Sequence, residues 1–315
     1  MSGEERPPAG PGARDDRADA LARSRHARLD GVPEPLADFD PERAAALCAA
    51  VCREALGDFA PALLLLPVTE RARLQAVVAY ARTLFDFAAD PGVEGERLAQ
   101  INRWQFALES ALGGERIGQP VDVAMAREHA RRAWPEGALD GIATAARRRV
   151  TQPRLATVEA AERQAEQLAA AVGEALLGAP PPAEAAAFGG ALLRLHALQH
   201  LGEAVAANRW PLAASELAAA DREPSSQPPA AVLAAARREA ERLRPRLLAA
   251  SRAVAALPPE VRRAAAFALL AALALLARVE EADEKLLALP PRLGLLARLA
   301  LLARARWLWL SSLTF

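Results

Sequence analysis

The sequence has 315 residues, of which 52% are hydrophobic, and its 39 basic and 39 acidic side chains give a formal net charge of zero. This length and composition allow one large domain or two modest ones, with a sizeable core. Because no net basic field attracts phosphate backbones, we predict no nucleic-acid partner. Cys48 and Cys52 are too few for a disulfide framework, which favours a cytoplasmic location.

Alanine and leucine dominate, while aromatic and β-branched residues are sparse, so the propensities favour helix nearly everywhere after about residue 40. Residues 1–39 are instead rich in Pro, Gly, Asp and Arg, which predicts a flexible N-terminal tail. Asp40, Pro41 and Glu42 form a helix start, and Thr69 is predicted to cap the next helix.

The predicted helices follow one another with short connections and no alternating, strand-like pattern. They cover residues 43–56, 69–90, 94–112, 121–134, 139–150, 158–177, 183–207, 230–255, 259–285 and 291–310. The natural architecture is an all-α, single-domain helical bundle. Its centre requires helices that are apolar nearly all round, and the runs 185–198 and 264–277 have this character.

Two small clusters of polar side chains could carry chemistry. Asp86 and Asp90 are spaced i,i+4 and therefore share a helix face, either as a cation site or as an ordinary acidic helix end. His196, His200 and Glu203 have similar spacing and either converge on a metal such as zinc or line a pocket without one. The zinc-protease motif is absent, since no glutamate follows the first histidine.

Arginine is concentrated in two further places. Residues 147–149 are three consecutive arginines, which meet a diphosphate or lipid headgroup or else form a solvated helix face. In the segment 291–315, Arg292, Arg298, Arg304 and Arg306 interleave with leucines, and Trp307, Trp309 and Phe315 gather at the end. This pattern predicts an amphipathic helix at a membrane interface, with packing of the aromatics on the bundle as the alternative.

Several short motifs resemble the squalene/phytoene synthase family over most of the chain after residue 40. The first is Ala81-Arg82-Thr83 followed by acidic residues, and the second is Gly202-Glu203 running into Asn208-Arg209-Trp210-Pro211-Leu212. Arg154, Thr157 and the pair Val172-Gly173 match as well. The resemblance implies a helical domain over 40–290 with the isoprenoid synthase fold and a central cavity.

In that family two acidic motifs face each other across the cavity and hold Mg²⁺, which neutralises the leaving diphosphate. The resemblance therefore implies a prenyltransferase that condenses two prenyl diphosphates in squalene, hopanoid or carotenoid metabolism. Carried over to this sequence, the catalytic and metal-binding carboxylates are Asp86, Asp90 and Glu203. The implied substrate-binding residues are Arg82, Arg154, His196, His200 and Arg209.

The sequence departs from the family pattern at the ligand positions. Phe85 and Ala89 stand where the first motif has aspartates, and His200 and Ala204 stand where the second has them. Leu155 stands where the family pattern has a tyrosine. The pattern also has an aromatic residue and an arginine at positions 166–167, where this sequence has Glu and Gln. We therefore predict a member of the family that binds prenyl diphosphates or related lipids, with catalysis weakened or lost.

The alternative is a non-catalytic protein with a protein partner, similar to the phytoene-synthase-like assembly factors of respiratory complex I, or a subunit beside an active paralogue. A third reading is a lipid-binding module that uses the emptied cavity. The expected location is the cytoplasm, at the periphery of the inner membrane.

Overall fold

The computed structural model describes residues 40–115, 119–135, 137–209, 212–217, 228–282 and 284–307. Regular structure in these ranges is entirely helical, which confirms the predicted all-α fold class. The predicted tail, Trp309 and Phe315 lie outside the described residues. No helix in the described part of the chain combines the length and apolarity needed to cross a membrane.

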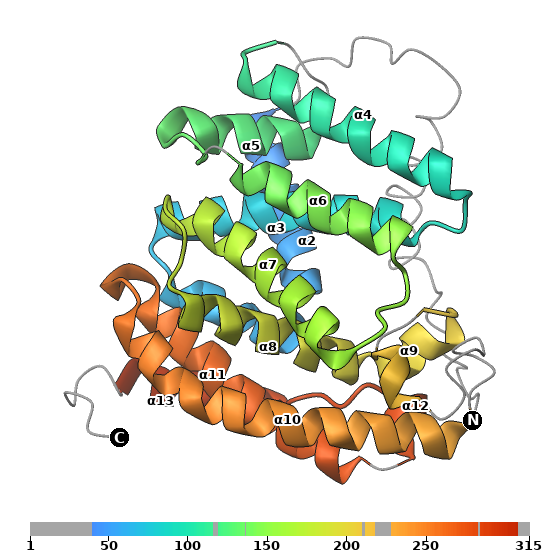
Figure 1. The fold of residues 1–315 in the computed structure, drawn as a ribbon. Helices are drawn as coiled ribbons and strands as arrows, with labels where there is room; N and C mark the ends of the chain where they lie inside the picture. Colours follow the sequence, from blue (N-terminus) through green and yellow to red (C-terminus); the bar gives the residue numbers. More distant parts are fainter. Residues whose placement is uncertain are drawn as a thin grey trace, which may run out of the picture. The chain divides into compact units, whose positions relative to one another are not determined.

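The five α-helices of the first half of the bundle share one hydrophobic core, and the 3₁₀ helix between the first two of them contributes to other cores (Figure 1). These elements are α2 (Pro41–Leu56), η1 (Gly57–Leu65), α3 (Val68–Ala89), α4 (Glu94–Leu112), α5 (Pro120–Arg131) and α6 (Ala138–Thr151). The centre of the shared core contains the fully buried Tyr80, Leu84, Ile101 and Met125. Burial of one apolar stripe from each helix holds these elements together.

The second half surrounds a separate core, except that α7 contributes its buried residues to the first core. Its elements are α7 (Val158–Leu177), α8 (Ala183–Gln199), α9 (Leu201–Ala206), η2 (Ala214–Glu216), α10 (Pro229–Ala256), α11 (Pro259–Glu281), α12 (Lys285–Ala288) and α13 (Leu295–Trp307). The two helices predicted to be most apolar, α8 and α11, both contribute to this core. In Figure 1, α7 and α8 lie between α6 and α10, and η1 reaches α11 directly.

Small residues let the middle helices approach closely. A Cβ added to Gly189 would lie 2.7 Å from Cβ of Ala169, and one added to Gly190 would lie 2.8 Å from Cγ of Glu166. Similarly, a Cβ on Gly141 of α6 would lie 2.9 Å from Cβ of Ala171. Helix α7 is therefore clamped between α6 and α8 at distances that larger residues would not permit.

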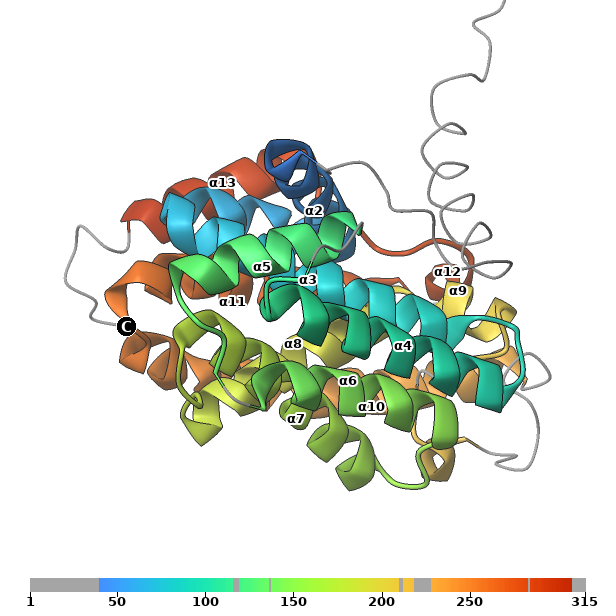
Figure 2. The same ribbon diagram turned by 90° about the horizontal axis from the view of Figure 1, so that it is seen from above.

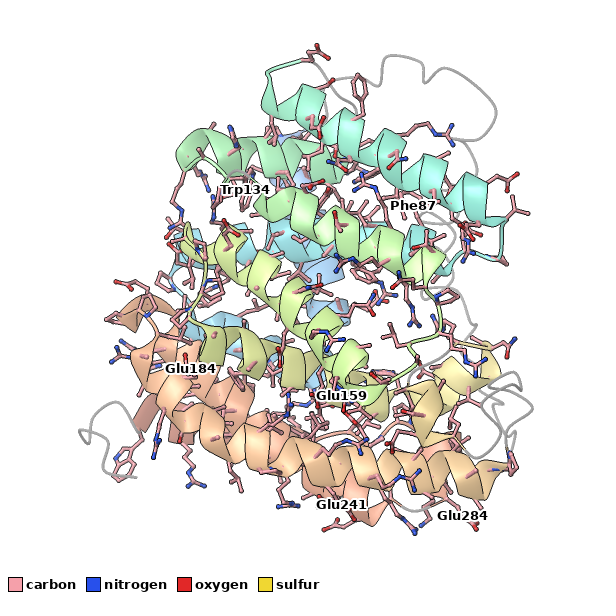
Figure 3. All side chains as sticks on the ribbon, viewed as in Figure 1. Phe87, Trp134, Glu159, Glu184, Glu241 and Glu284 are labelled. Carbon is pink, nitrogen blue, oxygen red and sulfur yellow. The ribbon has the colours of Figure 1, made fainter. Side chains whose placement is uncertain are left out.

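A buried arginine ties three helix ends together. Arg73 of α3 is 2% exposed and donates to the carbonyl oxygens of Ala175 at 2.7 Å, Arg132 at 2.6 Å and Ala133 at 3.2 Å. Its guanidinium stacks 3.6 Å above the ring of Trp134, which Figure 3 labels. Burial lowers the pKa of Arg73 to about 10, so the side chain remains charged at neutral pH.

The start of α3 corrects one prediction. The helix begins at Val68 with Pro67 as its N-cap, so Thr69 lies inside the first turn and does not cap it. The fixed φ of Pro67, here with ψ of 153°, already turns the chain into the helix. A threonine cap does occur at α7, where the hydroxyl of Thr157 accepts from Ala160 N–H at 3.2 Å.

The predicted helix over 183–207 is interrupted at His200, which has φ of −103° and ψ of 26°. Beyond this break, α9 packs against α12 so closely that a Cβ on Gly202 would lie 2.0 Å from the Leu287 carbonyl oxygen. The predicted helix 259–285 likewise ends at Glu281, before α12 begins. A long-range backbone contact therefore sets the direction of α9.

We expect Gly202→Ala to lower the free energy of unfolding by roughly 1 to 3 kcal/mol, because α9 or α12 must shift to admit the methyl group. Gly95→Ala is the matched control, since its added Cβ meets nothing within 4 Å. This control should leave stability unchanged or raise it by up to about 1 kcal/mol. Urea unfolding followed by circular dichroism measures both, and equal losses would contradict the close contact.

Candidate functional site

The first wall of the candidate site is the C-terminal part of α3. The i,i+4 spacing brings Arg82 and Asp86 together, and Nε of Arg82 donates to Oδ1 of Asp86 at 3.0 Å. Asp90 is the C-cap of the helix, with extended backbone, and its N–H donates to the Phe87 carbonyl oxygen. Asp86 is therefore held by a cation of its own helix, and Asp90 lies where the chain leaves that helix.

The phenylalanines beside Asp86 pack into the first core. The ring of Phe87 meets Trp104 of α4 edge-on with centroids 5.6 Å apart, and Figure 3 shows Phe87 beneath α4. Phe85, which stands at a position of the first motif, is half-buried against the same core. Ala89, at the other such position, is exposed.

The second wall is the junction of α8 and α9. The rings of His196 and His200 lie 4.6 Å apart between centroids with an interplanar angle of 52°. The break at His200 turns its ring toward the first turn of α9, where Nδ1 lies 3.1 Å from Oε2 of Glu203. The structure thus brings together the three side chains that the sequence placed on this wall.

The two walls influence each other electrostatically. Burial, together with the positive charges of His200 and Arg82, lowers the pKa of His196 to about 4, while Glu203 and Asp58 oppose this effect. His196 is therefore a neutral imidazole at physiological pH.

The arginines predicted to meet phosphates lie on two segments that pair through their backbones. After α6, the carbonyl oxygens of Leu155 and Ala156 accept from the N–H groups of Ala214 and Ser215 at 2.8 and 3.0 Å. Arg154 is thus adjacent to the segment that follows α9. Both Arg154 and Arg209 are exposed.

Asn208 ends α9 in the left-handed conformation, with φ of 52°, and so directs Arg209 out of the helix. Burial and the positive charge of Arg209 lower the pKa of Arg149. Sequence reasoning named Arg149 only as one of three consecutive arginines.

The other two arginines of that run bind neighbouring helices. Arg147 donates to Oδ1 of Asn102 on α4 at 2.8 Å, and Arg148 donates to Gln167 of α7. Helix α6 therefore uses these two cations to contact α4 and α7.

Sequence reasoning missed a network of ion pairs between α7, α8 and α10. Arg194 of α8 pairs with Glu162 of α7 at 3.2 Å and with Glu239 of α10 at 2.5 Å. The side chain of Glu239 is 3% exposed, and that of Arg194 is 12% exposed. An arginine in the middle of the otherwise apolar segment 185–198 is the signal that could have indicated a buried pair.

The network includes Glu166, at a position where the resemblance to the family implies an aromatic residue. Arg246 of α10 pairs with Glu162 at 2.6 Å and with Glu166 at 3.3 Å. At the other end, Arg242 joins Glu239 to Glu216, at 3.0 and 3.2 Å respectively. This network of ion pairs therefore joins α10 to α7 and α8.

A magnesium centre requires several converging oxygen ligands. Among the residues that the structure describes, no three His, Cys, Asp or Glu side chains form a group able to hold a metal ion. Asp86 is paired with Arg82, and Glu203 with His200. These residues do not fit a centre of several Mg²⁺ ions, which needs many converging carboxylate oxygens.

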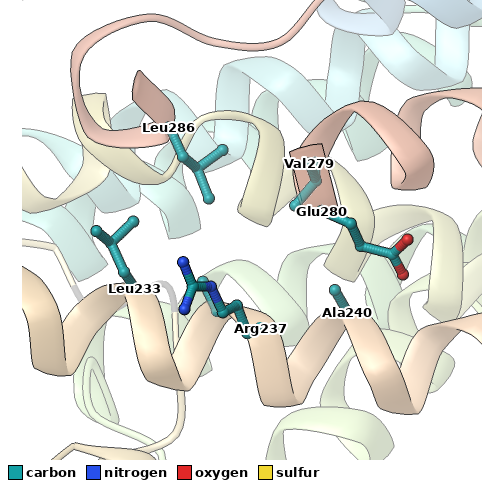
Figure 4. Close-up of a pocket in the computed structure, with 7 residues that line it drawn as sticks. Leu233, Arg237, Ala240, Val279, Glu280 and Leu286 are labelled. Carbon is teal, nitrogen blue, oxygen red and sulfur yellow. The ribbon is translucent and has the colours of Figure 1, made fainter. Parts of the chain in front are cut away.

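A pocket elsewhere lies between α10, α11 and α12 (Figure 4). It encloses about 240 Å³, including space open to solvent. Its lining residues are Leu233, Ala236, Arg237, Ala240, Val279, Glu280 and Leu286. None of these was predicted to belong to the site, and the pocket is not part of either wall.

The helical arrangement is that of the all-α isoprenoid synthase fold. A crystal structure of a dehydrosqualene synthase with ligand superposes with a TM-score of 0.68 at 18% identity, covering 87% of this chain and 100% of that one. Squalene synthase HpnC from Alicyclobacillus acidocaldarius gives 0.62 at 20% identity, covering 77% and 95%. YisP from Bacillus subtilis gives 0.57 at 13% identity, covering 84% and 96%.

Comparison of the sequence with family models identifies the family of the chain. The Squalene/phytoene synthase family model matches residues 40–302, and the chain therefore belongs to that family. This confirms the resemblance drawn from the motifs around Arg82 and Arg209. No curated protein sequence matches the chain significantly.

The depressed pKa of His196 predicts a loss of stability in mild acid. Above about pH 6.5 the imidazole is neutral in both the folded and the unfolded chain. Between about 6.5 and 4 only the unfolded chain binds this proton, so the free energy of unfolding falls by roughly 3 kcal/mol, at about 1.4 kcal/mol for each pH unit.

We expect His196→Gln to remove this part of the pH dependence while other groups keep theirs. Urea unfolding across this pH range measures the effect in both proteins. A constant difference in stability between wild type and variant from pH 7 to pH 4 would show that the folded protein does not exclude the proton.

Proposed function

We propose that this member of the squalene/phytoene synthase family binds a prenyl diphosphate or a related lipid, and that its magnesium-dependent condensation is weakened or lost. The observation that carries the proposal is the pairing of the remaining carboxylates with cationic or neutral partners of the protein. Asp86 is held by Arg82, and Glu203 by His200. Asp86, Asp90 and Glu203 remain the proposed carboxylates of any residual catalytic site.

The proposed binding chemistry uses the protein's own positive charges. Arg82, Arg154 and Arg209 are the candidate partners of a diphosphate, because guanidinium groups bind phosphate oxygens with several donors in fixed geometry. The neutral His196 and the neighbouring His200 line the proposed ligand site. We further propose that the protein acts at a membrane surface, since a prenyl chain partitions into lipid.

The proposal predicts no condensed product when the purified protein is incubated with Mg²⁺ and labelled farnesyl or geranylgeranyl diphosphate. Ligand binding, followed by the quenching of tryptophan fluorescence, should persist in excess chelator. Arg82→Gln should weaken it by about tenfold, since a hydrogen bond to a charged group contributes roughly 1.5 to 3 kcal/mol.

An active squalene synthase serves as the positive control for this assay. Turnover comparable with that enzyme would refute the loss of catalysis. Binding that disappears in chelator would instead indicate that a metal ion carries the diphosphate, contrary to the proposed arginine contacts.

A second candidate function is that of a non-catalytic assembly factor or partner subunit. It is favoured by the retention of contacts that build the fold, such as Gly202 against Leu287 and Arg73 against Trp134, beside ligand positions occupied by Phe85 and Ala89. It predicts that the tagged full-length protein copurifies a partner at constant stoichiometry from its own cell. A tagged active squalene synthase is the control, and recovery of the same proteins with both baits would count against a specific partner.

A further inference from the structure

Helix α13 has two faces of different character. Successive helical residues turn by about 100°, which places Leu301, Leu302 and Ala305 on one side. Ala305 is 2% exposed, and the two leucines are partly buried against the second core. The inner face of α13 therefore packs on the bundle through leucine and alanine, whereas Trp307, one of the aromatics that the alternative prediction placed there, is 62% exposed.

The rotation of α13 about its axis is fixed by a buried carboxylate. Asp58 of η1 is 1% exposed and accepts from Arg298 of α13 at 2.7 Å. It also accepts from the backbone N–H of Leu293 at 3.3 Å and from Nε2 of Gln199 at 2.7 Å. A buried, charge-assisted set of hydrogen bonds of this kind is strong and directional. The outer face of α13 is consequently held in one orientation.

That outer face is apolar. Leu295, Leu296 and Leu299, in the first two turns, are 71%, 82% and 52% exposed, and Trp307 at the other end is 62% exposed. Between residues 295 and 307 the sequence contains only Leu, Ala, Arg and Trp. Figure 2 shows α13 at an edge of the helical bundle. A contiguous apolar face that is exposed to water indicates that this surface contacts another molecule or a membrane.

The charge of the face identifies the kind of contact. Arg292, Arg304 and Arg306 are exposed around the leucines, and residues 285–307 contain no acidic side chain. A second copy of the chain that used the same face would bring further arginines and no acidic side chain of this segment to pair with them. An anionic surface matches them instead.

We propose that the outer face of α13 docks on an anionic lipid bilayer. The leucines and Trp307 lie at the boundary of headgroups and acyl chains, and Arg304 and Arg306 contact lipid phosphates. This deepens the proposed membrane location by naming the surface and the lipid chemistry. It does not depend on the proposed prenyl ligand, whose assay uses no vesicles.

Flotation of the full-length protein with vesicles tests the proposal. We expect binding to vesicles of phosphatidylcholine mixed with phosphatidylglycerol, weaker binding to phosphatidylcholine alone, and release by salt. Leu295→Glu combined with Leu296→Glu should reduce binding by at least about tenfold. Acidic residues in the first turn suit the helix dipole, so α13 should remain folded.

Two further variants separate charge from apolar contact. Arg304→Gln with Arg306→Gln should weaken binding to anionic vesicles by about fivefold per arginine and leave binding to neutral vesicles unchanged. Phe106→Glu on α4 is the matched control, because Phe106 is 69% exposed and α4 lies apart from α13 in Figures 1 and 2. This control should bind as the wild type does. Thermal unfolding verifies that each variant is folded.

Three results would overturn the proposal. The first is equal binding to neutral and anionic vesicles, and the second is binding that neither double substitution reduces. The third is no vesicle binding, together with self-association or a protein complex that the leucine substitutions abolish. In that case the face is a protein interface.

Discussion

The fold depends on the rule that a charge removed from water needs an opposite charge at hydrogen-bonding distance. Arg194 and Glu239 are nearly inaccessible to solvent, and their pairing joins α8 to α10. Glu162 completes the arrangement from α7. Removing one member of such a set typically destabilises a protein by about 3 to 5 kcal/mol, because the remaining charge is buried alone. The relative positions of the three helices are therefore fixed by charge as well as by apolar packing.

At the candidate site, carboxylates that are partly exposed also have partners within the protein. A carboxylate that binds magnesium must leave its oxygens available to the ion. Here Asp86 is satisfied by Arg82 on the preceding turn, and Glu203 by His200 at the helix break. Under the proposed loss of catalysis, protein cations have taken over the neutralising role that metal ions have elsewhere in the family. Neutral His196 then adds no charge of its own to this wall.

The sequence was sufficient to predict the helical fold, because alanine and leucine periodicity and the Gly and Pro residues at helix ends are local signals. The ends of α4 and α7 were predicted at Leu112 and Leu177, where the structure has them. The break at His200 was missed, because its cause is the contact of Gly202 with Leu287, which lies far along the chain. The motifs around Arg82 and Arg209 identified the family, but they carried no information on which side chains pair across helices.

Asp58 accepts hydrogen bonds from three segments that are distant in sequence: the end of α8, the chain before α13 and α13 itself. Each donor is satisfied by the same carboxylate, so a change at any one position alters the hydrogen bonding of the others. Over evolutionary time, residues 58, 199 and 298 should consequently be inherited as a set. A homologue that lacks α13 would leave Asp58 without its arginine partner, and we expect it to have another residue at position 58. The residue at this position should therefore indicate whether a homologue has the C-terminal helix.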